Sequence, residues 1–579
     1  MIHMRDPGQT GAFDPFEPIL SAPAMRRLRE GWQGLFRHAV LGLMPAGELA
    51  KRFDPRMGRP TKELYSMAGL VLVKEFNDWT AEEAVNAYLF DAGVQYALNL
   101  EPCGQSLCER TLERYEKKFV EDDLAALAME RVTAALAGRL GLDASRQRLD
   151  STHVFSDMAA YGRTRLMAAV VRRFLAQAGR EAPEAHAAVP EELRARYGPG
   201  SAKAFRDASK EEASRRKSRQ EVAEDMLFLV EQFAGDPLAS QWTAYADLLR
   251  VFGEQCEVAD GKVSVKAHPG ARAMQNPSDP DATRDGHKGP GCQAQIAETC
   301  AEGNETQLFT AVIPQAAADD DRDAMPEVLD SLESNGLMPG ILYADTHCGS
   351  DASQQECEAR GVDLQAPVPG RAPEKDPYAL NADDFVFDEE TGEVVSCPAG
   401  HAPAACERDE EAGETRAAMP SGACESCEFS GECPARTAAG GRRVFECADA
   451  GRRRAERRRE QATEAFKENY SVRSGIEGSN SGLKRRLGFG RLRCRGRPKV
   501  FHKILLKACG WNVLRAAATG TMRRLVAEIA AKRASAALSV VFSAVCPHGS
   551  LLRGRLAALG PLKTPIPAPA GETALGIAA

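Results

Sequence analysis

The sequence predicts an α/β protein in which a helical N-terminal domain precedes a core of alternating strands and helices, and two insertions interrupt that core. Three observations support this fold class. Apolar side chains recur at helical spacing between residues 24 and 140, as in packed helices. From residue 146 onward, short apolar runs alternate with helical segments, as in an α/β sheet. A charged helical stretch (160–255) and a cysteine-rich stretch (385–450) lie between the strand-like runs.

Composition narrows the class of protein. With 579 residues and a hydrophobic content of 43%, the chain is globular and long enough for roughly two to four domains. No stretch approaches the roughly 20 apolar residues of a membrane span, and the N-terminus lacks the apolar region of a signal peptide. We therefore expect a cytoplasmic protein without membrane contact. Its 16 cysteines are then expected to be reduced thiols and one metal cluster.

Residues 1–145 form the predicted helical domain. Thr80 and Glu83 have the spacing of a capping box at the start of one helix. Residues 106–118 read as a further helix, and a helix over 124–140 is expected to end at Gly141. Periodicity leaves two roles equally open for this domain. It could contact DNA, or it could serve only as a scaffold or a dimer contact, because apolar residues at helical spacing are core residues by default.

The strand-like runs of the core carry two aspartates. Asp150 interrupts the run 146–155, where an Asp before Ser-Thr is otherwise typical of a turn or cap. Further strands are expected at 262–267, 291–299 and 306–313, followed by a helix at 323–334. The apolar run 340–345 ends at Asp345. A carboxylate there is either a catalytic group at the end of a strand or the cap of the next helix. A helix (353–360) and a short strand (362–368) complete the predicted sheet.

The most informative stretch runs Y-S-V-R-S-G-I-E-G-S-N-S-G-L-K, from Tyr470 to Lys484. On one regular helix, Tyr470, Arg473, Glu477 and Lys484 fall within about 60° of arc. An amphipathic surface helix with a salt-bridged stripe would look similar. Three glycines make this a poor helix by propensity, however, and the cations continue beyond Lys484 through Arg485 and Arg486.

The order tyrosine, two residues, arginine, three residues, glutamate, six residues, lysine resembles the signature of bacterial insertion-sequence transposases of the DDE type. This sequence matches that spacing at every position. The resemblance implies a ribonuclease-H-like catalytic core over residues 146–520, interrupted by the insertions 160–255 and 385–450. For residues 1–145 it implies a helix-turn-helix-like, DNA-binding domain.

The same resemblance assigns roles to individual residues. It implies that Asp150, Asp345 and Glu477 form the catalytic triad and hold Mg²⁺ or Mn²⁺, which prefer oxygen ligands. Asp150 would bridge two ions, and each of the other two carboxylates would hold one. The implied DNA-binding residues are Tyr470, Arg473, Lys484, Arg485 and Arg486. Of these, Arg473 and Lys484 would bind phosphates, and Tyr470 would stack on or hydrogen-bond to a base or phosphate.

The function implied is DNA transposition. The protein would bind terminal inverted repeats, cleave DNA at the element ends and join the ends to target DNA, as a homodimer or larger oligomer. Two alternatives remain: a non-catalytic DNA-binding protein, such as an inactive relic or an end-binding repressor, and a metal-dependent nuclease without strand transfer.

The cysteine-rich stretch suggests a separate metal site. Cys424 and Cys427 form a C-x-x-C pair, and Cys433 and Cys397 complete a set of four thiolates suited to tetrahedral structural zinc. His401 and Cys406 are spare candidates. The alternatives are free thiols, a redox C-x-x-C and an iron–sulfur cluster.

Charge is distributed unevenly along the chain. The net charge is −8, but residues 442–500 hold 18 Lys/Arg against 7 Asp/Glu, which predicts a phosphate-binding surface. Residues 380–436 hold 3 Arg against 14 Asp/Glu, and this acidic block is expected either to aid solubility or to compete with DNA. The remaining segment, 521–579, is predicted to be a tail that is disordered from about Pro547.

Overall fold

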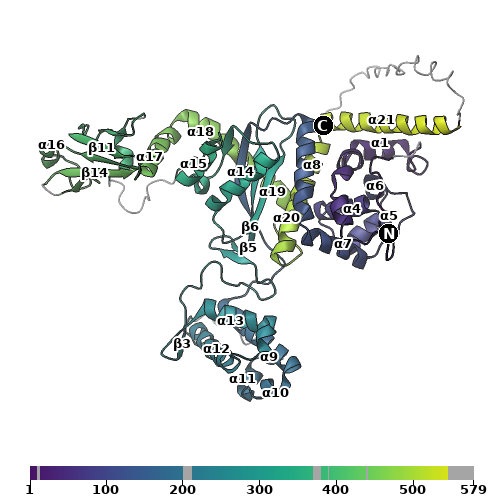
Figure 1. Ribbon diagram of the computed structural model, residues 1–579, viewed down its shortest axis with the longest axis horizontal. Helices are drawn as coiled ribbons and strands as arrows, with labels where there is room; N and C mark the ends of the chain where they lie inside the picture. The colour runs from purple at the N-terminus through teal and green to yellow at the C-terminus, as the bar shows by residue number, and fades with distance from the viewer. Residues whose placement is uncertain (10–12, 200–211, 369–379, 389, 439–440, 546–579) are drawn as a thin grey trace, which may run out of the picture.

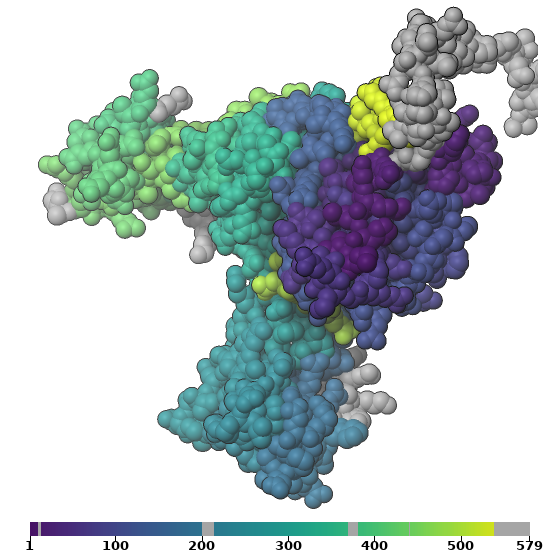
Figure 2. Space-filling model, turned by 45° about the vertical axis from the view of Figure 1, so that its right-hand side comes forward, coloured from purple at the N-terminus to yellow at the C-terminus, as the bar shows by residue number. Residues whose placement is uncertain are grey.

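The computed structural model describes residues 1–9, 13–199, 212–368, 380–388, 390–438 and 441–545 (Figure 1). A mixed sheet lies at the centre, and three lobes extend from it (Figures 1 and 2). The predicted α/β class with a helical N-terminal region is confirmed. The tail predicted from Pro547 lies outside the described residues. Among the helices described, none is both long enough and apolar enough to cross a membrane.

The central sheet has the strand order β6-β5-β1-β7-β8. Strand β1 is antiparallel to β5, which is antiparallel to β6, whereas β7 and β8 run parallel to β1. A short strand, β4, pairs with the first residues of β5. The strands are β1 (Arg146–Val154), β4 (Thr283–Asp285), β5 (Gly289–Thr299), β6 (Phe309–Ala316), β7 (Ile341–Tyr343) and β8 (Asp363–Gln365).

Both faces of this sheet are covered, which is why β5 is buried along most of its length, its glutamines and Glu298 included. Helices α14 (Met325–Ser334) and α15 (Asp351–Ala359) pack on one face through Leu149, Leu342 and their neighbours. On the other face, α20 (Arg497–Ala517) inserts between the sheet and the N-terminal helices.

The N-terminal helices share one hydrophobic core with that face of the sheet. Val71 and Leu136 belong to the same buried cluster as Ile296 and Trp511. Helix α21 (Gly520–Val545), in the segment predicted to be a tail, also packs on this lobe. The helices are α1 (Ala22–Glu30), α2 (Trp32–Leu35), η1 (Phe36–Val40), η2 (Leu41–Leu43), α3 (Ala46–Ala50), α4 (Leu64–Phe76), α5 (Ala81–Phe90), α6 (Ala92–Ala97), α7 (Glu109–Glu121) and α8 (Leu124–Leu140).

Local sequence signals explain the ends of these helices. Thr80 and Glu83 form the predicted capping box of α5. Gly141 ends α8 in the left-handed conformation, at φ +59°, which glycine adopts without steric cost. The helix predicted from residue 106 begins three residues later, at Glu109, because the Ser106 hydroxyl is held by the Lys62 ammonium at 2.9 Å and the chain is still extended at Cys108.

The first insertion is a helical lobe with its own core. Phe174, Phe233 and Tyr245 pack at its centre. The strand predicted at 262–267 pairs within this lobe and not with the central sheet. Its elements are α9 (Arg163–Glu181), α10 (Pro183–Ala187), α11 (Glu191–Arg196), α12 (Glu212–Gln232), η4 (Ala239–Gln241), α13 (Thr243–Gln255), β2 (Cys256–Ala259) and β3 (Lys262–Val265).

The cysteine-rich insertion is a small β-rich lobe. Phe385 and Phe445 stack at its centre, with ring centroids 3.7 Å apart. Helix α17 (Asp449–Gln461) connects the lobe to the sheet (Figure 1). Its elements are η7 (Ala382–Asp384), β9 (Val386–Phe387), β10 (Val394–Ser396), β11 (Ala405–Asp409), β12 (Glu414–Ala418), α16 (Ser421–Glu425), β13 (Arg436–Thr437) and β14 (Arg443–Ala448).

Candidate active site

Sheet register brings the two aspartates level. Arg148 of β1 pairs with Tyr343 of the parallel strand β7. Asp150 and Asp345 each lie two residues further along, so they occupy corresponding positions on neighbouring chain segments. The Asp150 side chain is 16% exposed, which leaves one route of approach for a ligand.

Asp345 lies just beyond its strand and caps the next turn. Strand β7 ends at Tyr343, and Asp345 begins the 3₁₀ turn η6 (Thr346–Cys348). Its Oδ1 accepts from the backbone N–H groups of His347 at 3.0 Å and Cys348 at 3.2 Å. The two sequence interpretations therefore do not exclude each other, because the other oxygen, Oδ2, takes no part in the cap and lies 3.5 Å from Nδ1 of the exposed His347.

The stretch from Tyr470 to Lys484 is not the single regular helix that was predicted. Tyr470 ends α18 (Glu464–Tyr470), a 3₁₀ turn, η8 (Ser471–Ser474), follows, and α19 (Gly475–Leu487) begins after it. The break has a visible cause, because Arg148 Nη1 donates to the carbonyl of Val472 at 3.0 Å. The Tyr470 hydroxyl donates to the Ala344 carbonyl at 3.0 Å, so this ring braces the chain beside Asp345.

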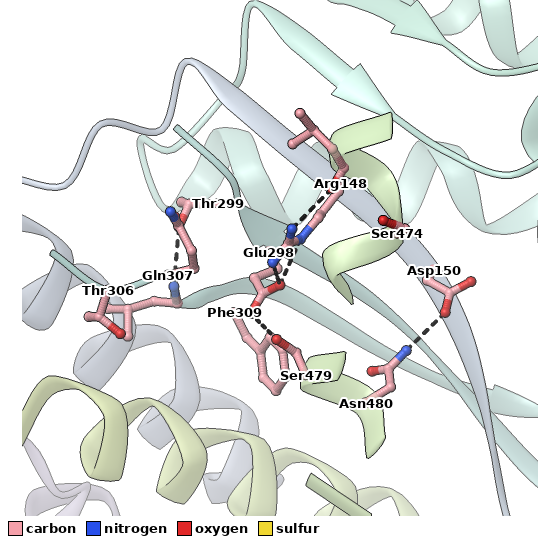
Figure 3. A network of polar contacts seen from close by, with 12 residues as sticks. Arg148, Asp150, Glu298, Thr299, Thr306, Gln307, Phe309, Ser474, Ser479 and Asn480 are labelled. Atoms are coloured by element: carbon pink, nitrogen blue, oxygen red, sulfur yellow. Dashed lines mark hydrogen bonds and ion pairs between the residues drawn. The ribbon is translucent and has the colours of Figure 1, made fainter. Parts of the chain in front are cut away.

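Arg473 lies between two of the three carboxylates. Its Nη2 is 2.8 Å from Asp150 Oδ1, and its Nη1 is 3.5 Å from Glu477 Oε1. Asn480 Nδ2 donates to the other oxygen of Asp150 at 2.9 Å (Figure 3). Glu477 is 67% exposed and faces solvent beside this pair.

The neighbouring carboxylates influence the charge state of Asp150. Burial raises the pKa of Asp150; Asp345 and Glu477 raise it further, while Arg473 and the hydrogen bond from Asn480 oppose them. Within the part of the chain that the structure describes, no three His, Cys, Asp or Glu side chains stand together as a metal-binding group. The Arg473 guanidinium supplies the positive charge between Asp150 and Glu477 instead.

Two buried polar atoms at the site lack protein partners. Asn480 Oδ1 and Arg473 Nε have no hydrogen-bond partner among the described residues. Asn480 Oδ1 is an acceptor and would suit a water molecule bound to a cation. Arg473 Nε is a donor and would suit an anion. The oxygen-rich donor set fits Mg²⁺ in its chemistry.

A pair of lysines flanks the carboxylates. Lys484 is half-buried; burial lowers its pKa, Lys288 lowers it further, and Asp150 opposes the shift. Lys288 comes from the turn between β4 and β5, and its Nζ is 3.5 Å from Ser151 Oγ. Two like charges near one another, neither of them in an ion pair with any described carboxylate, favour an anion.

Sequence reasoning missed several of these side chains. Asn480 follows Glu477 by three residues, a spacing that places both on one helix face and was a usable signal. Lys288 lies in a glycine-flanked turn, 137 residues from the Ser151 hydroxyl that it approaches, and carried no local signal. Asp321 was also missed; it accepts from Ser151 at 2.9 Å and from Gln295 at 2.6 Å on the far side of β1.

Much of the basic block binds the protein itself. Arg453 of α17 pairs with Asp351 at 2.7 Å, and Arg458 pairs with Asp383 at 2.6 Å. These contacts fasten the cysteine-rich lobe to the sheet, so the prediction that the whole of 442–500 is a phosphate-binding surface is too broad. Arg485 and Arg486 are exposed, and among the described residues neither forms an ion pair.

The predicted zinc ligands surround one small cavity. Cys397, Cys424, Cys427 and Cys433, together with His401, line a space of about 20 Å³. Burial raises the pKa of Cys424, and Cys433, Cys397 and Cys427 add to this, whereas Arg443 opposes it. The four thiols are thus neighbours, although they are not drawn in to metal-binding distances. The spare candidate Cys406 instead accepts from the backbone N–H of Val394 at 3.4 Å, away from this cavity.

Comparison with known families adds one finding. Residues 396–517 match the family model described as a transposase DDE domain. The matched segment contains Glu477, the cysteines and α20, whereas Asp150 and Asp345 precede it. No curated protein and no solved structure matches the chain. The family match supports a DDE transposase.

Proposed function

We propose that this protein is a DNA transposase that binds terminal inverted repeats, cleaves DNA at the element ends and joins them to target DNA. One observation carries the proposal. The β1–β7 register sets Asp150 level with Asp345, and Arg473 bridges Asp150 at 2.8 Å to Glu477 in the first turn of α19 at 3.5 Å. The strand order and the antiparallel-then-parallel pattern resemble a ribonuclease-H-like core.

Asp150, Asp345 and Glu477 would hold the divalent ions. Mg²⁺ bound to such a set lowers the pKa of an attacking water or 3′-hydroxyl and stabilises the leaving oxygen. Asn480 fixes the rotamer of Asp150 through one oxygen. Tyr470 fixes the backbone before Asp345 through the Ala344 carbonyl. The protein itself thus supplies oriented carboxylates in a partly dehydrated place.

Cations around the site would hold the DNA backbone. Arg473 balances Asp150 and Glu477 in the free protein and would turn to a phosphate when the carboxylates bind divalent ions. Lys288 and Lys484 offer a second anion site, and the exposed Arg485 and Arg486 extend it along α19. Phosphate contacts of this kind position DNA without reading its sequence.

A groove on the N-terminal lobe favours a further DNA contact. It measures about 650 Å³ and is lined by Arg59, Lys62, Arg114, Lys117 and Lys118. Lys118 lies over the Phe53 ring at 4.9 Å, and Lys117 pairs with Glu121 at 3.6 Å, so part of this charge is already engaged. Because two ends must be joined, we propose that a homodimer or larger oligomer forms on DNA.

The test uses DNA from the two flanks of the reading frame. Wild-type protein should nick the ends only with Mg²⁺ or Mn²⁺ and should join them to a target duplex. Glu477→Gln should bind the same ends and fail to cut, and full activity in this variant would refute the mechanism. Cleavage without joined products would identify a nuclease, and binding without cleavage would identify a relic or repressor.

We also propose that the cysteine cavity holds structural Zn²⁺, because four thiols around one space are a zinc-type donor set. Purified protein should contain about one zinc per chain, measured by elemental analysis. Cys427→Ser should lose the metal, whereas Cys406→Ser should keep it. If both variants contain the same amount of zinc per chain, the metal is not bound by Cys427 and lies outside this cavity.

A further inference from the structure

Glu298 is a fully buried carboxylate that belongs to neither the triad nor the DNA-binding set. It lies on β5, its side chain is 0% exposed, and each oxygen accepts two hydrogen bonds. Oε2 accepts from Arg148 Nε at 2.8 Å and Nη2 at 2.6 Å. Oε1 accepts from Ser479 Oγ at 2.6 Å (Figure 3). The same oxygen accepts from Arg515 Nη1 at 2.8 Å.

The donors come from the elements that carry the candidate catalytic groups. Arg148 is two residues before Asp150 on β1, and Ser479 is two residues after Glu477 on α19. Arg515 comes from α20, which packs behind both. Glu298 therefore connects the strand of one carboxylate to the helix of another through its own two oxygens.

Arg148 makes a second connection to the same helix. Its Nη1 donates to the Val472 carbonyl, next to Arg473. A Cβ added at Gly475 would overlap Arg148 Nη1 and lie 2.7 Å from Cζ, so the guanidinium lies directly against the first residue of α19. The start of α19 is thereby fixed on β1 at the level where Arg473 bridges Asp150 and Glu477.

Such a network is well suited to fixing the distance between β1 and α19. Buried charges persist only when they are paired and hydrogen-bonded, and charge-assisted hydrogen bonds are short and directional. A shift of α19 relative to β1 would leave Glu298 or Arg148 buried without a partner. The packing of apolar residues alone would tolerate small sliding more readily, because apolar contacts are not directional.

We propose that Glu298, together with Arg148, Ser479 and Arg515, is a positioning group that holds Glu477 at working distance from Asp150. The inference rests on the proposed transposase function. It predicts that the network matters for divalent-metal binding and for cleavage, and not for the capture of DNA ends.

The test compares Glu298→Gln with a matched control, Glu75→Gln. Glu75 is also a buried carboxylate with two cations, Lys74 at 3.0 Å and Lys503 at 2.8 Å, but it lies between α4 and α20 and away from the triad. Three quantities are measured on folded protein: Mn²⁺ affinity without DNA by electron paramagnetic resonance, end-binding affinity, and cleavage rate at saturating DNA.

For Glu298→Gln we expect Mn²⁺ affinity to fall about tenfold, as for other residues that orient metal ligands. Cleavage should fall about 100-fold, while end binding stays within about twofold of wild type, since no phosphate-binding group has changed. Higher Mn²⁺ should partly restore cleavage. Glu75→Gln should lose thermal stability and keep wild-type Mn²⁺ affinity.

Equal Mn²⁺ affinities in Glu298→Gln and Glu75→Gln would overturn the positioning role. If Glu298→Gln does not fold, Ser479→Ala removes one donor and should weaken Mn²⁺ binding in the same direction; an unchanged affinity would likewise overturn it. Absence of cleavage in wild-type protein would count against the proposed function instead, and the Mn²⁺ measurement would still decide the positioning role.

Discussion

The three glycines of α19 offer a sharp test, because the structure gives each a different reason to be glycine. A Cβ at Gly478 would meet nothing within 4 Å. Replacement by alanine should therefore add helix propensity and stabilise the protein by about 1 kcal/mol. A Cβ at Gly475 would instead displace the Arg148 guanidinium, and a Cβ at Gly482 would lie 2.7 Å from Trp511 Cη2.

For Gly475→Ala the opposing terms can be weighed. The same propensity gain of about 1 kcal/mol applies. Against it, Arg148 must leave the Val472 carbonyl and shift on Glu298, and a hydrogen bond to a charged group contributes about 1.5–3 kcal/mol. Arg148 is a flexible side chain in general, but here its far end is tied at three atoms. The expected net effect is a destabilisation of about 0.5–2 kcal/mol.

Urea denaturation of the two single variants measures these free energies of unfolding directly. Gly475→Ala and Gly478→Ala add the same methyl group to the same helix, three residues apart, so each is the control for the other. If both variants stabilise the protein equally, Arg148 is not held against Gly475 and the reasoning fails.

Three further predictions follow from the contacts above. Lys288→Ala should weaken DNA binding and reduce the slope of the logarithm of DNA affinity against the logarithm of salt concentration by about 1. Lys262→Ala, at an exposed position of β3, should leave both the affinity and the slope unchanged in filter-binding titrations. Equal slopes in the two variants would show that Lys288 does not contact DNA. Arg453→Ala should lower the free energy of unfolding by about 1 kcal/mol and increase proteolysis near α17, without weakening the binding of DNA ends. Arg485→Ala should weaken the binding of DNA ends and leave proteolysis unchanged. His502 is buried, and burial is the main cause that lowers its pKa to about 4. Because the histidine of the unfolded chain binds its proton near pH 6.5, the free energy of unfolding should fall by about 3 kcal/mol as the pH drops from 6.5 to 4. In His502→Phe, the plot of unfolding free energy against pH should be flatter over this range.

Local patterns predicted the parts of the fold that local forces decide. The capping box at Thr80 and the left-handed Gly141 need only their neighbours in the chain. Strand β5 is buried along most of its length although it contains Gln293, Gln295 and Glu298, so its burial does not follow from its composition. The strand before Asp345 was found from its apolar run, although it ends two residues earlier than predicted.

Contacts between distant residues could not be predicted this way. The 3₁₀ turn before α19 depends on Arg148, which is 324 residues from Val472. The N-terminal helices were expected to be a separate domain, yet Val71 of these helices and Ile296 of β5 belong to one hydrophobic core. The periodicity of residues 61–140 shows which helix faces are buried, but it cannot show that the central sheet covers them. The predicted tail, 521–579, begins with helix α21, whose contacts with the N-terminal lobe likewise join residues far apart in the chain.

The arginines show most clearly why composition alone misleads about function. A count over 442–500 treats each cation as equally available to DNA, but a cation already paired in a half-buried site would lose that partner on binding phosphate. Arg453 and Arg458 face this cost. Arg473 faces it too, yet its partners are the carboxylates proposed to bind divalent cations, so its release would be coupled to the arrival of metal and phosphate together. Lys288 and Lys484 face no such cost, because neither forms an ion pair with a carboxylate of the described residues, and Lys288 lowers the pKa of Lys484. The affinity of this surface for DNA is therefore set by which cations lack a carboxylate partner, and two of them lie at the triad itself.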